Sequence, residues 1–316
     1  MAGMDIDRRL EANRQRMAEL LATLTSNDGL HRSCLDGVSL GRATHHHPRS
    51  PVLYEPSIYI VARGRKVGYI GDRTVTYDAN NYLVLAAPLP FECKTDPGVD
   101  GPMLGLSVRV APGVIGDLAS RMPPHRPAAL ADAPECMEAT PLEPAMSDAA
   151  VRLLECLTTP IEAEILGPGI VREIVYRALC GPQGPVLLAM IGRHGQTAQI
   201  NTALRWMHAR YAEPFSVGQM AGEVGMSVSA FHHRFKAATA SSPVQYLKSV
   251  RLHKARDLIV NGGVGATQAA LSVGYESASQ FSREFKRFFG ATPSDEARRL
   301  RTLMGRPEPV DAQLAG

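Results

Sequence analysis

The chain has 316 residues, which is longer than a single domain usually is, and its 45% hydrophobic content is enough to form cores. We therefore expect two folded domains. The charged N-terminus lacks the apolar stretch of a signal peptide, and no later run approaches a membrane span, which predicts a cytoplasmic protein without membrane contact. Five cysteines without a C-x-x-C pair argue against a disulfide framework or a structural zinc site and favour reduced, mostly buried thiols.

The formal net charge of +3 is unevenly distributed along the chain. Residues 197–302 contain 14 Lys+Arg against 7 Asp+Glu, whereas the rest of the chain has 20 against 24. The C-terminal third is therefore basic enough to attract a polyanion, and the N-terminal part is mildly acidic.

The N-terminal part is predicted to begin with one helix and to continue with strands. Apolar residues recur at helical spacing over the first 30 residues, up to a Ser-Asn-Asp-Gly cluster. Between residues 52 and 112, short alternating runs separated by turn residues predict an antiparallel β-meander, folded as a small barrel or sandwich. Six prolines between residues 123 and 144 predict an irregular crossing.

Helical periodicity returns at Ser147 and continues, with tight turns, to about Arg301. A helix that ends at Gly181 is predicted to have an apolar face, and another helix is predicted over residues 185–193. We predict a boundary near residue 196, which gives an α+β domain over residues 1–196, an all-α domain over residues 197–302 and a disordered tail over residues 303–316.

The all-α part contains an internal repeat of about 28 residues. Its best-matched segments are SVSAFHHRFK (residues 227–236) and SASQFSREFK (residues 277–286). Each copy predicts a helix, a turn and a second helix. Gly225 or Gly274 supplies a left-handed turn conformation, and Ser227 or Ser277 caps the second helix.

The second helix of each copy repeats its apolar face and varies its polar face. The apolar faces carry Phe231, Phe235 and Ala238 in the first copy and Phe281, Phe285 and Phe288 in the second. The polar faces carry Ser229, His232, His233 and Lys236 in the first copy and Ser279, Ser282, Arg283 and Lys286 in the second.

Two such helices are suited to reading two pieces of double-stranded DNA, because an α-helix fits the major groove. The segment between the copies, PVQYLKSVRLHKARDLIV, predicts a long helix able to hold them about one DNA turn, roughly 34 Å, apart. A solvated polar face is the simpler interpretation of one copy alone. Two copies in a basic segment favour DNA binding.

Residues 197–302 resemble the DNA-binding domain of the AraC/XylS family of bacterial transcription regulators, through GMSVSAFHHRFK, SSPVQYL, RLHKARDLI and GYESASQFSREFKRFFGATP. The resemblance implies seven helices with two helix-turn-helix units. It implies base-facing roles for Ser229, His232 and His233 in the first unit and for Ser279, Gln280, Ser282 and Arg283 in the second. It places Lys236 and Lys286 nearer the DNA backbone. His232-His233 and the ending SDEARRL depart from the family pattern.

The stretch from YEPSIYIVARG to PLPFEC, followed by IVREIVYRALCGPQG, resembles the cupin-like regulatory domain of one AraC subgroup. This resemblance implies that residues 1–196 sense a small-molecule effector and self-associate through their helices, so that the protein is a homodimer. The effector is expected to control DNA binding or the recruitment of RNA polymerase as a further partner.

An apolar barrel with few polar groups is a common form of small-molecule pocket. Tyr54, Tyr59, Tyr69 and Tyr82 either line such a pocket or fill the interior, and filling is the simpler interpretation. Cys93 is a candidate thiol for sensing electrophiles, although a cysteine that simply points into the barrel is favoured.

His45-His46-His47 is a candidate metal site, because imidazoles are common metal ligands. A metal-binding cupin follows H-x-H with a nearby Glu, whereas Glu55 lies at the wrong distance here and the neighbouring prolines predict a loop. We therefore expect no metal, no cofactor and no catalytic residue. A metal-dependent cupin enzyme fused to a DNA-binding module is the alternative, and a non-specific architectural DNA binder is disfavoured by the modest charge.

Overall fold

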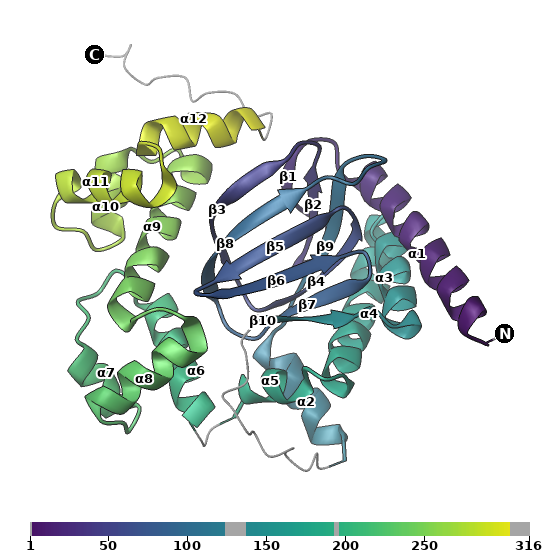
Figure 1. Ribbon diagram of the computed structural model, residues 1–316, viewed down its shortest axis with the longest axis horizontal. Coiled ribbons are helices and arrows are strands. Elements are labelled where there is room, and N and C mark those ends of the chain that lie inside the picture. Colours follow the sequence, from purple (N-terminus) through teal and green to yellow (C-terminus); the bar gives the residue numbers. More distant parts are fainter. Residues whose placement is uncertain (1, 124–136, 193–195, 304–316) are drawn as a thin grey trace.

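The computed structural model describes residues 2–123, 137–192 and 196–303 (Figure 1). The strands are β1 (Gly29–Arg32), β2 (Val38–Ala43), β3 (His47–Tyr54), β4 (Ser57–Arg63), β5 (Arg65–Ile70), β6 (Arg73–Asp78), β7 (Asn81–Leu85), β8 (Leu89–Asp96), β9 (Met103–Arg109) and β10 (Met137–Pro141). The helices that accompany them are α1 (Ala2–Leu24), α2 (Pro112–Arg121), α3 (Pro144–Cys156), α4 (Pro160–Cys180) and α5 (Gly184–Ala189). The C-terminal helices are α6 (Gln196–Ala209), α7 (Val217–Glu223), α8 (Val228–Thr239), α9 (Pro243–Gly262), α10 (Ala266–Ser272), α11 (Ala278–Phe289) and α12 (Pro293–Leu303).

The strands form two antiparallel sheets that face each other. The larger sheet has the order β1-β2-β9-β4-β7-β10, and the smaller has the order β3-β8-β5-β6. The predicted sandwich is confirmed, but the predicted meander is wrong. Within the described residues, strands consecutive in sequence pair only as β1 with β2 and β5 with β6.

The chain changes sheet at Gly64, the single residue between β4 and β5, instead of turning back as a hairpin. Gly64 has φ +77°, and a Cβ there would lie 2.7 Å from the Asp96 carbonyl oxygen and 2.9 Å from the Met103 Cβ. Only glycine combines that backbone conformation with so close an approach. The alternation of apolar and polar residues within a strand does not reveal such a bend. The order of the strands in the sheets could therefore not be predicted from that pattern.

Two segments predicted to be irregular are strands. Pro48 and Pro51 lie in β3, an edge strand whose pairing with β8 shifts register between His47 and Ser50. Edge strands and bulges tolerate proline because no ladder hydrogen bond is lost there. Residues 137–141 of the predicted proline-rich crossing form β10, and Pro144 begins α3. The crossing otherwise lies at residues 124–136, outside the described residues.

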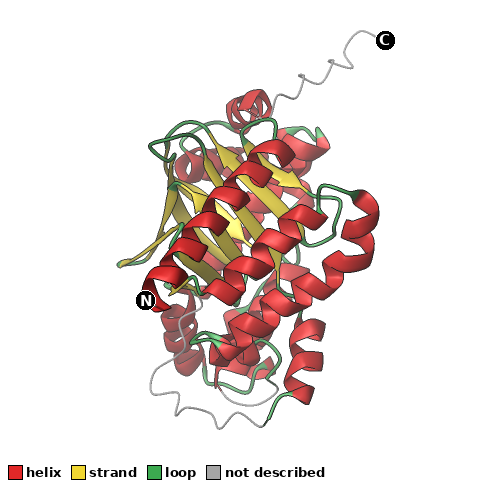
Figure 2. Cartoon of the chain, turned by 90° about the vertical axis from the view of Figure 1, so that its right-hand side faces the viewer, coloured by secondary structure: helices red, strands yellow, loops and turns green. Residues whose placement is uncertain are grey.

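The larger sheet is covered on both faces. One face meets the smaller sheet across a core that includes Tyr59, Tyr77, Leu83, Phe91 and Cys93. The other face is covered by α1, α3 and α4 across a second core, seen as the layer of helices in front of the strands in Figure 2. The predicted N-terminal helix is confirmed by α1, whose Met17, Leu20 and Leu21 are buried in this second core.

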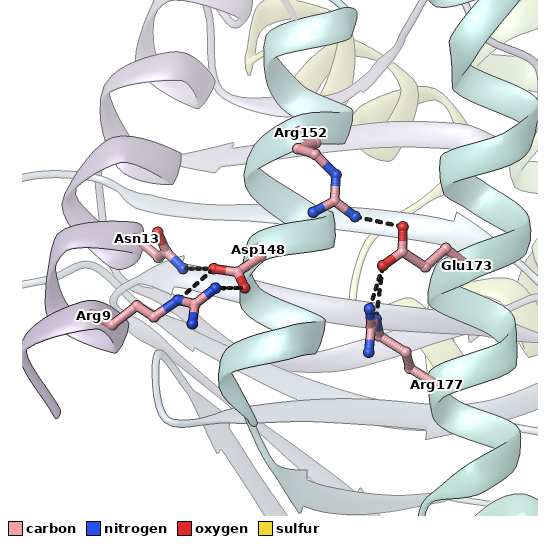
Figure 3. Close-up of polar contacts among 6 residues, drawn as sticks. All are labelled: Arg9, Asn13, Asp148, Arg152, Glu173 and Arg177. Carbon is pink, nitrogen blue, oxygen red and sulfur yellow. Dashed lines mark hydrogen bonds and ion pairs between the residues drawn. The ribbon is translucent and has the colours of Figure 1, made fainter. Parts of the chain in front are cut away.

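Charged side chains join the three covering helices at their solvent side (Figure 3). Asp148 on α3 accepts hydrogen bonds from Arg9 and, at 2.8 Å, from Asn13 of α1. Glu173 on α4 accepts from Arg152 of α3 and, at 2.9 Å, from Arg177 one turn along its own helix. Because these pairs lie at the solvent side of the helices, each is expected to contribute little to stability.

The helix predicted to end at Gly181 is α4, which begins ten residues before Ile170 and contains Pro168. Four of its five predicted apolar-face residues are buried: Ile174, Val175, Ala178 and Leu179. Cys93 and Cys156 are buried as expected, whereas Cys34 and Cys180 are exposed free thiols. None of the helices within the described ranges is long and apolar enough to span a bilayer.

The domain boundary near residue 196 and the tail over residues 303–316 remain predictions. Residues 193–195 and 304–316 lie outside the described residues, and α6 begins at Gln196.

Replacing Gly64 with Ala should destabilise the fold, because the new Cβ meets backbone and the residue must keep φ +77°. We expect the free energy of unfolding to fall by roughly 2–4 kcal/mol, measured by urea denaturation. Gly116→Ala is the matched control, since nothing lies within 4 Å of its added Cβ and the site is inside α2. That control should stabilise by roughly 0.5–1 kcal/mol. An equal effect of both changes would contradict the role given to Gly64.

Candidate nucleic-acid interface

Both repeat units form the predicted helix, turn and helix. Gly225 and Gly274 have φ +68° and +85° and end α7 and α10 in the left-handed conformation. The side chains of Ser227 and Ser277 accept hydrogen bonds at 3.3 Å from the backbone N–H of the third residue along α8 and α11. These caps satisfy free donors at the start of each second helix and fix where it begins.

The repeated aromatic faces are buried, as predicted. Phe231 and Phe235 are fully buried in the core of the first unit, and Phe281 and Phe285 are fully buried in the core of the second. Each pair is in ring contact, with centroids 5.5 Å and 5.4 Å apart. Burial of the aromatic face leaves the opposite face of each helix directed to solvent.

Every sequence-predicted DNA-binding residue lies on one of these exposed faces. On α8 the exposed side chains include Ser229, His232, His233 and Lys236. On α11 they include Ser279, Gln280, Ser282, Arg283 and Lys286. Their contacts with DNA remain a prediction.

A single helix, α9, belongs to the cores of both units. Its first half contributes Tyr246, Leu247 and Val250 to the first core, and its second half contributes residues such as Leu252 and Ile259 to the second. The long connecting helix predicted from the sequence is therefore confirmed, and it positions the two units by packing against each of them.

Arg251, at the middle of α9, joins the two units through backbone carbonyls. Its guanidinium donates to Tyr211 at 2.7 Å and Glu213 at 2.8 Å, in the loop after α6, and to Gly274 at 3.3 Å, in the turn before α11. That turn packs so tightly that a Cβ on Gly274 would lie 2.3 Å from the Ala212 carbonyl oxygen. The loop after α6 and the second turn therefore cannot move independently.

The departure from the family pattern after Pro293 does not remove the last helix. The hydroxyl of Thr292 accepts from the Asp295 N–H at 3.3 Å, which caps α12. Glu296 is 1% exposed and pairs with Arg299 at 2.9 Å and Arg256 at 3.6 Å. The segment SDEARRL thus places two acidic residues in the first turn of α12, where they are favourable. One of them, Glu296, also forms a buried ion pair with Arg256 of α9.

The β-sandwich contacts the first unit through the turn between β7 and β8. Ala87 is buried in the first unit's core, and Pro88 accepts a hydrogen bond from the Tyr246 hydroxyl. His208 on α6 lies 2.8 Å from the same hydroxyl. Since that O–H donates to Pro88, the Tyr246 oxygen accepts from Nε2–H of His208.

A second contact joins the sandwich to the second half of α9. Arg256 donates to the Pro51 carbonyl of β3 at 3.4 Å, and Lys254 lies 3.8 Å from the Glu55 carboxylate. Figure 1 shows α9 running alongside the smaller sheet. The DNA-binding units and the sandwich are therefore docked along one helix.

The structure separates the five candidate effector residues. Tyr54, Tyr59 and Cys93 lie in the core between the two sheets. Tyr69 instead lies under the guanidinium of Arg49, 4.2 Å from its ring centroid, and Tyr82 packs in the core beneath the covering helices. Tyr82 also lines a surface pocket together with Met146, Tyr176 and Cys180. The contact of all five residues with an effector remains a prediction.

Sequence reasoning missed two polar groups in the same interior. Tyr77 is buried with its hydroxyl 3.7 Å from the Cys93 sulfur, and Lys66 is buried with its ammonium 3.0 Å from the Thr95 hydroxyl. Burial raises the pKa of Tyr59 to about 12, so its phenol stays protonated. Strand alternation could have revealed Lys66, since Lys66, Gly68 and Ile70 all occupy inward positions of β5.

The three consecutive histidines do not converge. His45 lies 2.7 Å from the Thr44 hydroxyl, His46 lies 2.7 Å from Asp96, and His47 begins β3. Burial lowers the pKa of His47, with Lys66 and Arg299 adding to that effect against the attraction of Asp28. Across the described ranges, no group of three or more His, Cys, Asp or Glu side chains is placed to hold a metal ion.

Two family profiles match the two parts of this chain. One described as "AraC-type transcriptional regulator N-terminus" matches residues 34–186, and one described as "Helix-turn-helix domain" matches residues 220–299. The chain belongs to the AraC family of transcription regulators. The predicted resemblance of both parts is thereby confirmed.

Curated transcription regulators match part of this chain. The transcriptional activator RhaS of Escherichia fergusonii is 31% identical over 104 residues, which is 33% of this chain and 37% of RhaS. The probable thc operon regulatory protein of Rhodococcus erythropolis is 29% identical, covering 48% of this chain and 44% of the relative. The virulence activator VirF of Yersinia enterocolitica is 24% identical, over 48% of this chain and 56% of VirF. The aligned parts thus span only about a third to just over half of these relatives.

The solved structure of ToxT from Vibrio cholerae, crystallised with an unsaturated fatty acid, has the same fold. It aligns with a TM-score of 0.61 at 14% identity, over 90% of this chain and all of the ToxT chain. A second ToxT structure, without ligand, aligns with a TM-score of 0.60 at 11% identity over 84% of this chain. At these identities the likeness establishes the α+β architecture.

The pH dependence of stability should reveal His208. Burial lowers its pKa from 6.5 to about 4, with Lys254 adding to the effect, so the unfolded chain binds a proton that the folded chain excludes. This contribution is present above pH 6.5 and is lost as the pH falls toward 4. The wild type loses stability between pH 6.5 and pH 4. We expect this loss to be smaller by roughly 1–2 kcal/mol in His208→Gln, measured by thermal unfolding. The exposed His232→Gln is the control and should leave the pH profile unchanged.

Proposed function

We propose that this protein is a sequence-specific transcription regulator whose β-sandwich domain senses a small molecule and controls DNA binding by the C-terminal domain. The observation that carries the proposal is the pair of capped helices, α8 and α11, with buried aromatic faces and different exposed side chains, mounted on one shared helix. In this proposal Ser229, His232 and His233 read one stretch of bases, and Ser279, Gln280, Ser282 and Arg283 read another.

The control rests on linkage between the two domains. An effector shifts DNA affinity only if it binds one domain arrangement better than another. The contacts of Pro88 with Tyr246 and of Pro51 with Arg256 support one docked arrangement. An effector that rearranges the sandwich interior around Tyr54, Tyr59 and Cys93 would act on β3 and on the β7–β8 turn, because both border that interior. Recruitment of RNA polymerase and action in the cytoplasm are part of the same proposal, and no enzymatic step is included.

We also propose that α4 mediates formation of a homodimer. Its side chains Ile161, Ile165 and Leu166 are 59%, 68% and 53% exposed, an unusual amount of aliphatic surface for one face of a solvent-facing helix. The face is separate from α8 and α11, so a dimer formed there leaves both units free for DNA (Figure 1).

The most informative experiment selects genomic DNA fragments with the purified full chain and sequences those bound. A shared sequence motif with two separated blocks is expected. Recovery of fragments without a shared motif, together with a steep salt dependence, would favour non-specific binding instead. The genes beside the bound fragments indicate which small molecules to test as effectors.

Arg283→Ala and Lys236→Ala should weaken DNA binding in different ways. Loss of Arg283 should reduce affinity for the selected site by about 1–3 kcal/mol and relax base preference at one position, whereas loss of Lys236 should weaken all sequences alike. Electrophoretic mobility shifts on the selected site and on random DNA separate the two. Arg8→Ala in α1, an exposed cation far from both units, is the charge-matched control. Equal losses on specific and random DNA for both variants would contradict the assignment.

Ile165→Glu should weaken the dimer, because it places a charge in the apolar contact. We expect the dissociation constant measured by sedimentation equilibrium to rise by at least about tenfold. Leu271→Glu changes an equally prominent exposed leucine on α10, at 54% exposure, and should leave the dimer intact. A wild-type protein that sediments as a monomer would contradict the proposed homodimer.

A further inference from the structure

An acidic side chain occupies the proposed second DNA-reading helix, at Glu284 of α11. Its carboxylate turns back toward the protein and accepts a hydrogen bond from the Tyr275 hydroxyl at 2.9 Å, while the Lys248 ammonium of α9 lies 2.7 Å away. The side chain is only 16% exposed, although its neighbours Ser282 and Arg283 are exposed. Glu284 is thus held from behind by two elements of the domain.

This arrangement explains how a carboxylate is tolerated on a helix that faces DNA. A free carboxylate beside phosphates would oppose binding, but the Lys248 ammonium compensates its charge. Burial opposes ionisation of Glu284, yet the hydrogen bonds from Lys248, Tyr275 and Gln280 lower its pKa. The group is therefore an ionised acceptor at neutral pH, and it accepts hydrogen bonds but donates none.

The same carboxylate touches one of the proposed base-reading residues. The Nε2 group of Gln280, one turn earlier on α11, donates to Glu284 Oε1 across 3.4 Å. Because an ionised carboxylate only accepts, the amide nitrogen and not the amide oxygen must face Glu284. One Nε2 hydrogen and the Oε1 atom of Gln280 are then left on the exposed side of the helix.

We propose that Glu284 is a positioning residue that orients the Gln280 amide to read an adenine in the major groove. The remaining N–H of Gln280 donates to adenine N7, and its Oε1 accepts from the adenine amino group. This assignment rests on the proposed DNA-reading role of α11 and adds to it a named base and the side chain that selects it. Glu284 itself makes no contact with DNA.

The first repeat unit lacks all three parts of this arrangement. In the alignment of the two copies, Ala230 stands at the position of Gln280, Arg234 at the position of Glu284 and Met226 at the position of Tyr275. The helix scaffold is repeated, but the supporting carboxylate occurs in the second unit. The adenine is therefore expected in the half of the site bound by α11.

The test uses the full chain and a random duplex library, from which bound sequences are selected and read. Four proteins are compared: wild type, Gln280→Ala, Glu284→Ala and the control Glu276→Ala. Glu276 is an exposed carboxylate in the turn before α11, so its removal changes the net charge as Glu284→Ala does, without touching Gln280. Glu284→Gln keeps the side-chain volume and serves if the alanine variant fails a circular dichroism check of folding.

The wild type and Glu276→Ala should select the same adenine. Gln280→Ala and Glu284→Ala should each lose preference for it by about tenfold, within the range that a bidentate contact supplies, and the double variant should lose little more. Both glutamate variants should bind random DNA slightly better, because a negative charge is gone. A purely structural role for Glu284 would instead weaken binding to all sequences.

Three results would overturn the proposal. The first is that Glu284→Ala keeps the wild-type preference while Gln280→Ala loses it, which would show that the amide needs no support. The second is that Glu284→Ala loses preference at every position together with general affinity, which would make its role structural. Selection of no motif by the wild type would refute the proposed function itself, a failure distinct from the other two.

Discussion

The arrangement of the C-terminal half depends on α9 packing into two cores at once. Tyr246 and Val250 complete the core of the first unit, and Leu252 and Ile259 complete that of the second. A helix is stiff over this length, so burial of both halves fixes how far apart α8 and α11 lie and how they are turned. Arg251 adds hydrogen bonds to the loop after α6 and to the turn before α11. Neither unit can reorient without breaking one of these contacts.

The β-sandwich docks on that same helix, which connects the N-terminal domain physically to the proposed DNA-reading helices α8 and α11. Tyr246 is part of the first unit's core and also donates to Pro88 of the β7–β8 turn. Arg256 joins the buried Glu296 of α12 and also donates to Pro51 of β3. Both contacts combine a core residue of the DNA-binding half with backbone of the sandwich, so a shift of the sandwich is transmitted to packed groups and not to a flexible surface.

The two repeat units have similar aromatic cores but different polar side chains around their second helices. The aromatic pairs have nearly the same ring separation in both units, 5.5 Å and 5.4 Å. Around them the second unit has the Lys248, Glu284 and Tyr275 cluster, where the first has unrelated residues. The two units therefore share their buried phenylalanines but differ in the polar side chains around them.

The sequence by itself determined the two-part organisation, the helical half and the candidate reading faces. Those features are local: caps at Ser227 and Ser277, glycine turns and a 3.6-residue aromatic period act within a few residues of each other. A β-rich domain, either a barrel or a sandwich, was also foreseen, because alternation marks a strand wherever one face is buried. The prediction missed β1 and β2, which lie before the predicted strands. It also failed for β3 and β10, whose prolines are tolerated because these strands lie at sheet edges.

Tertiary structure alone decided the strand order, the docking along α9 and the core in which each candidate effector residue lies. The switch of sheet at Gly64 depends on the distant Asp96 and Met103, and no local pattern encodes that approach. Tyr59 and Tyr82 look equivalent in sequence, yet one faces the other sheet and the other faces the helices. Pairing between residues far apart in the chain sets those directions, so they follow from the assembled fold and not from the order of residues in any one strand.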